Sequence, residues 1–190
     1  MKNKTIIESI QCLLLGYQNI SSSPNHNKKD LNSLRYLIGQ SIREYDIPNV
    51  NRHVSQAAQK RWDGLSTNNI FNYHYKDIVV CDRLSRSIKY ELFEGANKKG
   101  KLTRLSKNSR FDFRKMFHED HVIPVSLILD ELLKLTSVNY SSIEKLLNDI
   151  HICVLLKEED RMIGRTKGRT ISFSHNITHI YNMNKIFLFP

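Results

Sequence analysis

The chain has 190 residues, a length typical of one domain and sufficient to bury a core without disulfides or a structural metal. Its formal net charge is +10, from 29 Lys and Arg against 19 Asp and Glu, an excess that often indicates a polyanionic partner such as nucleic acid. The 3 cysteines lie far apart in the sequence, which excludes a disulfide framework or a paired-cysteine zinc site and favours a cytoplasmic setting. No stretch approaches the roughly 18 apolar residues of a membrane-spanning helix, so no membrane partner is expected.

The first third of the chain predicts helices, because its apolar residues recur at helical spacing. We expect three of them, over residues 5–17, 30–45 and 54–62. Asp30 is placed to cap the second, and the residue before Pro48 resists the helical conformation and should end it. Residues 1–65 therefore form an expected helical N-terminal region.

The pattern changes after Gly64 to alternating aromatic and β-branched residues, which predicts a β-hairpin from residues 73–81 and 87–93. A basic loop over 95–101 follows, and the positive charge continues beyond it. The expected contacts with a DNA backbone in this stretch are Lys98, Lys99, Lys101, Arg104 and Arg110.

Residues 66–190 form the expected second region, and the two regions are expected to pack as one compact α+β unit. Within it, apolar periodicity predicts helices over 126–135 and from Ser141 onward, then a strand over 150–156 and a helix over 157–163. The tail should add a strand over 170–173 and an apolar segment over 186–189 that closes the core.

Two clusters of acidic and histidine residues flank the helices at 126–150. In the first, Asp120 offers a hard oxygen ligand for Mg²⁺, and His121 titrates near neutrality and is suited to take a proton from water. Adjacent strand residues point to opposite faces, so both can serve one site only where the strand ends, as Pro124 indicates. His118 is expected to be a neighbour of this pair, exposed or partly packed.

The second cluster is Glu158, Glu159 and Asp160, at the start of the helix over 157–163. Acidic residues are electrostatically favoured at a helix N-terminus without any function. A strand followed directly by this helix could nevertheless bring one of these carboxylates close to Asp120. Arg161, the next residue, is a candidate contact to a scissile phosphate.

The run Asp120-His121-Val122-Ile123-Pro124, together with Leu155-Leu156-Lys157-Glu158-Glu159-Asp160-Arg161, resembles the HNH, or ββα-metal, nuclease family. The resemblance covers about residues 115–165. It implies that His121 is the general base, that Asp120 is the first metal ligand, and that Asp160 is the second, with Glu159 as its rival. His151 stands where the family commonly has its middle Asn, and an imidazole opposite His121 would hold the base by a hydrogen bond.

The chain departs from the family in two further respects. The zinc-binding cysteines of many members are absent, and the insert of residues 125–150 is longer than the family's usual loop. Its two apolar helices would supply local packing in place of the missing zinc.

The resemblance implies an α+β fold with a ββα-metal core, and an endonuclease that hydrolyses double-stranded DNA with one Mg²⁺ or Mn²⁺ ion per active site. The clusters look like those of HNH type II restriction endonucleases, and a homodimer is one assembly expected for this protein. A homing or phage nuclease, a non-specific defence nuclease, and a basic DNA-binding module without catalysis remain alternatives.

Overall fold

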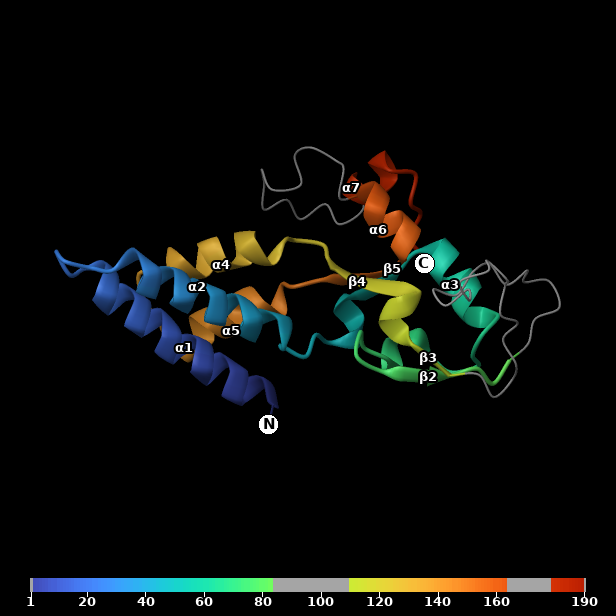
Figure 1. Ribbon diagram of the computed structural model, residues 1–190, viewed down its shortest axis with the longest axis horizontal. Helices are drawn as coiled ribbons and strands as arrows, with labels where there is room; N and C mark the ends of the chain where they lie inside the picture. Colours follow the sequence, from blue (N-terminus) through green and yellow to red (C-terminus); the bar gives the residue numbers. More distant parts are fainter. Residues whose placement is uncertain (1, 84–109, 164–178, 190) are drawn as a thin grey trace, which may run out of the picture. The chain divides into compact units, whose positions relative to one another are not determined.

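The computed structural model describes residues 2–83, 110–163 and 179–189. Over these residues the fold is α+β, with seven α-helices, a mixed three-stranded sheet and a separate pair of antiparallel strands (Figure 1). The chain divides into two compact units that alternate along the sequence. The first contains Met1–Asn51 and His121–His151, and the second contains Arg52–Asp120, Ile152–Lys167 and Asn176–Pro190.

The first unit is a bundle of four helices: α1 (Lys2–Ser21), α2 (Lys28–Arg43), α4 (Val125–Leu133) and α5 (Tyr140–Asn148). Helix α1 packs against α2 and α5, and α4 packs against α2 and α5. Each helix turns an apolar stripe inward, as the sequence periodicity predicted. The most deeply buried side chains are Ile7, Ile10, Leu14, Ile38, Ile42, Ile128, Leu132, Ile143 and Leu147. The insert helices therefore complete the bundle with the N-terminal helices.

The caps of these helices differ from those expected. Asn27 caps α2, because its side chain accepts a hydrogen bond from the backbone N–H of Lys29, and Asp30 lies in the first turn of the helix. Asn139 caps α5 in the same way through Ser142. Asn27 lies three residues before Asp30, the expected cap of this helix, and Asn139 lies two residues before Ser141, where the second insert helix was expected to begin.

The three-stranded sheet has the strand order β1-β5-β4, with β1 at Arg52–Val54, β5 at Ile152–Leu156 and β4 at Phe117–His121. Strand β1 is parallel to β5. Strand β4 is antiparallel to β5: the Lys157 N–H, just after β5, donates to the carbonyl of Met116, just before β4. Strand β4 lies at one edge, and helix α6 (Lys157–Ile163) follows β5 without a connecting loop.

Strand β1 was not expected, since residues 54–62 were predicted to be helical from their first residue. Helix α3 (Gln56–Asp63) begins two residues later, where the Ser55 hydroxyl accepts from the backbone N–H of Ala58. The far side of β1 is paired with the C-terminal segment. There the Gln56 N–H donates to the Phe187 carbonyl at 2.8 Å, and the Phe189 N–H donates to the Val54 carbonyl at 2.8 Å.

The core of the second unit lies under one face of this sheet. Trp62, of which 1% is exposed, packs edge-on against Phe113 and Phe117, and Val154 of β5 joins the same cluster. Strand β2 (Ile78–Val80) pairs with β3 (Arg110–Asp112) beside this core. The expected hairpin partner of 73–81, residues 87–93, lies outside the described residues, as do the basic loop over 95–101 and the expected strand over 170–173. At the C-terminal end Ile186 is buried, whereas Phe187 and Phe189 are exposed.

Among the described residues, no helix is both long enough and apolar enough to cross a membrane. All three cysteines are free thiols; Cys81 and Cys153 are buried and Cys12 is exposed. The short α-helix α7 (His179–Met183) completes the second unit.

Candidate metal centre

Three side chains of the second unit bring potential metal ligands together: His118 and Asp120 from β4, and Asp160 from α6. One ligand atom from each lies within 4.8 Å of the other two, and His118 Nε2 is 3.5 Å from Asp160 Oδ1. Residues two apart on a strand share a face, which is why His118 and Asp120 project toward the same side of the sheet. Neighbouring ligand atoms of a six-coordinate ion with bonds near 2.1 Å lie about 3 Å apart. The three side chains would therefore need to move only slightly closer together to bind one ion.

Asp120 is the least exposed member of the group. Only 4% of the residue is accessible, and the Tyr181 hydroxyl donates to its Oδ2 at 2.9 Å. Burying a carboxylate is costly unless hydrogen bonds or a cation compensate its charge. Asp120 is thus held at the inner end of the group, while His118 and Asp160 lie nearer to solvent.

Cys153 lies beneath this carboxylate on β5. Burial, followed by the negative charges of Asp120 and Glu159, raises the pKa of its thiol far above the ordinary value, and a hydrogen bond with Tyr181 opposes the rise only in part. Burial and these charges therefore favour the neutral thiol over the thiolate.

Glu159, the rival of Asp160 in the sequence analysis, is occupied by other partners. Its Oε2 accepts a hydrogen bond from the Leu156 N–H at 2.9 Å and another from the Ser55 hydroxyl at 2.5 Å. The first bond is the backward half of a capping box, in which the third residue of a helix satisfies the N–H of the residue before it. Glu159 therefore ties the start of α6 to the end of β5 and to Ser55, the residue after β1, and Asp160 faces His118.

The two residues predicted to be catalytic, His121 and His151, are half-buried and belong to the first unit. The Val122 N–H donates to the His151 carbonyl at 3.0 Å, so the residue opposite His151 across the two strands is Val122. The expected alignment of His151 opposite His121 is displaced by one residue. Burial lowers the pKa of His151, and the nearby Asp149 partly opposes that shift.

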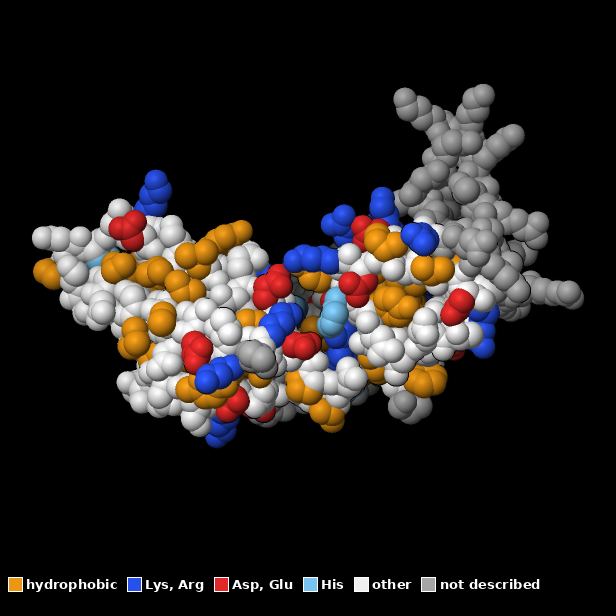
Figure 2. Space-filling view, turned by 90° about the horizontal axis from the view of Figure 1, so that it is seen from below, with side chains coloured by type: hydrophobic (Ala, Val, Ile, Leu, Met, Phe, Trp, Pro, Cys, Tyr) orange, Lys and Arg blue, Asp and Glu red, His pale blue; other side chains and the backbone are white. Residues whose placement is uncertain are grey.

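Most of the predicted DNA contacts, Lys98, Lys99, Lys101 and Arg104, lie outside the described residues. Arg110 is exposed at the start of β3, and Arg161 is exposed on α6 directly after Asp160. The segments 84–109 and 164–178 together contain ten Lys and Arg and only two acidic residues, and so carry most of the excess positive charge. On the face shown in Figure 2, acidic and basic side chains of the described residues are interspersed.

The opposite face of β4 carries a second group of charges. There the guanidinium of Arg52 donates to Glu119 Oε1 at 2.5 Å and to the Tyr73 carbonyl at 3.1 Å, and His74 Nδ1 lies 3.5 Å from the same carboxylate oxygen. Side-chain exposure is 2% for Arg52 and 9% for Glu119. The opposite charges of Arg52 and Glu119 compensate each other on the buried face of the sheet. This ion pair has a structural role.

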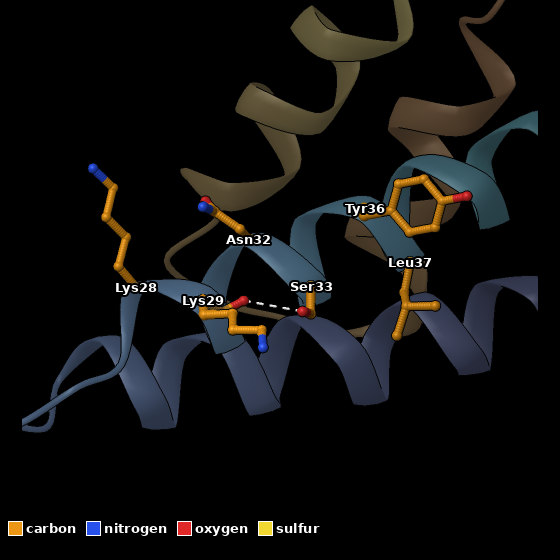
Figure 3. A pocket seen from close by; sticks show the side chains of 6 residues that line it. All are labelled: Lys28, Lys29, Asn32, Ser33, Tyr36 and Leu37. Carbon is orange, nitrogen blue, oxygen red and sulfur yellow. Dashed lines mark hydrogen bonds between the residues drawn. The ribbon is translucent and has the colours of Figure 1, made fainter.

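A shallow, open pocket lies in the first unit on the outer surface of α2 (Figure 3). Its lining residues all come from that one helix: Lys28, Lys29, Asn32, Ser33, Tyr36 and Leu37. None of them is a candidate catalytic or metal-binding residue, and the segments 1–51 and 121–151 contain equal numbers of basic and acidic residues. The pocket therefore lacks the carboxylate and imidazole groups of a metal centre.

His118 was expected to be a neighbour of the catalytic pair and not a member of the metal group. The signal was present in the alternation of β4, because a residue two positions before Asp120 must share its face. Tyr181 had no comparable signal, since its contact with Asp120 joins residues 61 positions apart.

Comparisons of this chain with protein-family models, with curated proteins and with solved structures each found no match.

Proposed function

We propose that this protein is a metal-dependent endonuclease that hydrolyses phosphodiester bonds of double-stranded DNA, with β4, β5 and α6 as a ββα-metal core of the HNH type. The observation that carries the proposal is the convergence of one imidazole and two carboxylates, one of them buried, from β4 and α6. The order of these elements, an antiparallel strand pair followed directly by a helix, supports it.

In this proposal His118, Asp120 and Asp160 hold one divalent cation. When bound, the cation would supply the positive charge that neutralises the scissile phosphate and stabilises the departing oxygen. Carboxylate oxygens suit Mg²⁺ and Mn²⁺, and the imidazole of His118 shifts the preference toward Mn²⁺ and later transition metals.

His121 is proposed as the base that accepts a proton from the attacking water. The support is its position directly after Asp120 in the sequence and the ability of an imidazole to exchange protons near neutral pH. Arg161, next to Asp160 on α6, is proposed to contact the phosphate through its guanidinium. Residue His151 supports the base in this proposal only if its side chain reaches His121 despite the displaced alignment of the strands.

The proposed biological class is a type II restriction endonuclease, whose sequence recognition would involve the basic segments around 84–109. A homing, phage or non-specific defence nuclease would share the same metal centre. Digestion of plasmid and phage DNA separates them, since a restriction enzyme gives discrete fragments and a non-specific nuclease gives a smear.

The proposal is tested by incubating these DNAs with the protein in Mg²⁺, in Mn²⁺ and with EDTA. We expect cleavage with either ion and none with EDTA, and an equally folded His121→Ala variant should be inactive. Failure of the folded wild-type protein to cleave any DNA would overturn the proposal. If the protein instead binds DNA in a strongly salt-dependent manner that EDTA does not alter, it is a basic binding module, the function that its net charge of +10 alone would favour.

A further inference from the structure

The hydroxyl of Tyr181 makes a direct hydrogen bond to a member of the metal group. It donates to Asp120 Oδ2 at 2.9 Å, and both residues are buried, with 1% of Tyr181 and 4% of Asp120 exposed. A hydrogen bond to a charged acceptor in a dry environment is stronger and more directional than one at the surface.

The backbone of Tyr181 is fixed independently of this bond. Its carbonyl accepts from the N–H groups of Asn184 at 3.0 Å and Ile186 at 2.9 Å, which closes the end of α7. Lys185 has a φ of 57°, the left-handed conformation that reverses the chain at this point. The residues that follow pair with β1 through the Phe187 and Phe189 backbone. The C-terminal segment therefore anchors Tyr181 to the same sheet that carries Asp120.

We infer that Tyr181 is a positioning residue for the metal centre: its hydroxyl holds the Asp120 carboxylate in the orientation in which it binds the cation. The inference rests on the proposed metal-dependent function and adds to it a residue 61 positions away from Asp120 in the sequence. Residues that hydrogen-bond a metal ligand typically contribute about 10- to 100-fold to metal affinity. They hold the ligand in its binding orientation, whereas a ligand left free to rotate must lose that freedom when the metal binds.

The test is an equilibrium titration of the full chain with Mn²⁺, followed by isothermal calorimetry or by the loss of the free-ion paramagnetic resonance signal. Tyr181→Phe removes the hydroxyl and keeps the ring. Tyr45→Phe is the matched control, since Tyr45 is also buried and its hydroxyl donates to Asn148 at 2.7 Å within the helical unit. Melting temperatures of both variants report the loss of one buried hydrogen bond.

We expect the Mn²⁺ dissociation constant of Tyr181→Phe to rise by about tenfold or more, and that of Tyr45→Phe to stay at the wild-type value. In cleavage assays the Mn²⁺ concentration for half-maximal rate should rise for Tyr181→Phe, with most of the rate recovered at saturating Mn²⁺. Equal Mn²⁺ affinities for wild type and Tyr181→Phe would overturn the inference while leaving the proposed function intact. A wild-type chain that binds no Mn²⁺ would overturn both.

Discussion

His118 Nε2 lies 3.5 Å from Asp160 Oδ1, which joins the edge strand β4 to the first turn of α6. Two groups at this distance and half in contact with solvent could form an ordinary surface ion pair, which contributes little to stability. The buried carboxylate of Asp120 within 4.8 Å of both distinguishes this pair, because it adds a second negative group that the cation proposed above would neutralise.

The first prediction concerns the choice of metal. His118→Ala should weaken Mn²⁺ binding by at least about tenfold and Mg²⁺ binding by much less, because an imidazole is a better ligand for transition metals than for Mg²⁺. His74→Ala, which removes a half-exposed imidazole from the opposite face of β4, is the control. Competition titrations with both ions give the ratio of Mn²⁺ affinity to Mg²⁺ affinity. If this ratio is the same in His118→Ala as in the wild type, the imidazole is not a ligand.

The second prediction separates Glu159 from Asp160. Glu159→Ala should lower the free energy of unfolding by about 1–2 kcal/mol, because it removes the acceptor for the Leu156 N–H and the Ser55 hydroxyl, and should leave Mn²⁺ affinity unchanged. Urea denaturation and the Mn²⁺ titration measure the two effects. A loss of Mn²⁺ affinity with normal stability would instead assign Glu159 as the ligand.

The third prediction concerns the buried pair Arg52 and Glu119. Glu119→Ala should cost about 3–5 kcal/mol of stability, because it leaves the guanidinium of Arg52 buried without its carboxylate. The double variant with Arg52→Ala should be less destabilised than the sum of the two single variants. Urea denaturation of the wild type, the two single variants and the double variant gives the four free energies of this double-mutant cycle. If the effects of the two single substitutions add up to that of the double variant, Arg52 and Glu119 are not coupled.

The elements that could be predicted from the sequence are those whose signal lies within one short segment. The four helices of the first unit and the elements β5 and α6 were predicted, because their apolar periodicity lies within each segment. Strand β1 was missed, since Arg52–Val54 is only three residues long and pairs with residues 100 positions away in β5. Long-range pairing of this kind leaves almost no trace in the local pattern.

The residues of the candidate site also divide into those with a local sequence signal and those without one. Asp120 and Asp160 were predicted from their motif, and the role of His118 could have been predicted from the two-residue alternation of β4. The occupation of Glu159 by Ser55 could not, because that bond joins residues 104 positions apart. The contact of Tyr181 with Asp120 was hidden for the same reason.

The fourth prediction is a pH dependence of stability. Burial lowers the pKa of His151 in the folded state, so the folded protein binds this proton less readily than the unfolded chain does. Its contribution to stability is therefore complete above the ordinary histidine pKa of about 6.5 and is lost as the pH falls through that value toward the lower folded pKa. His151→Asn should lose less stability than wild type between about pH 7 and pH 5 in paired denaturation curves. Identical pH profiles would contradict this prediction.

The most direct test of the proposed metal centre is to compare the Mn²⁺-dependent rates of plasmid cleavage by Asp160→Asn and Glu158→Gln. Glu158 is an exposed acid on the same helix and lies outside the metal group, so its variant controls for charge and folding. We expect a loss of at least about 100-fold for Asp160→Asn and a near wild-type rate for Glu158→Gln. Equal rates for the two variants, or cleavage that persists in EDTA, would contradict the proposed metal centre.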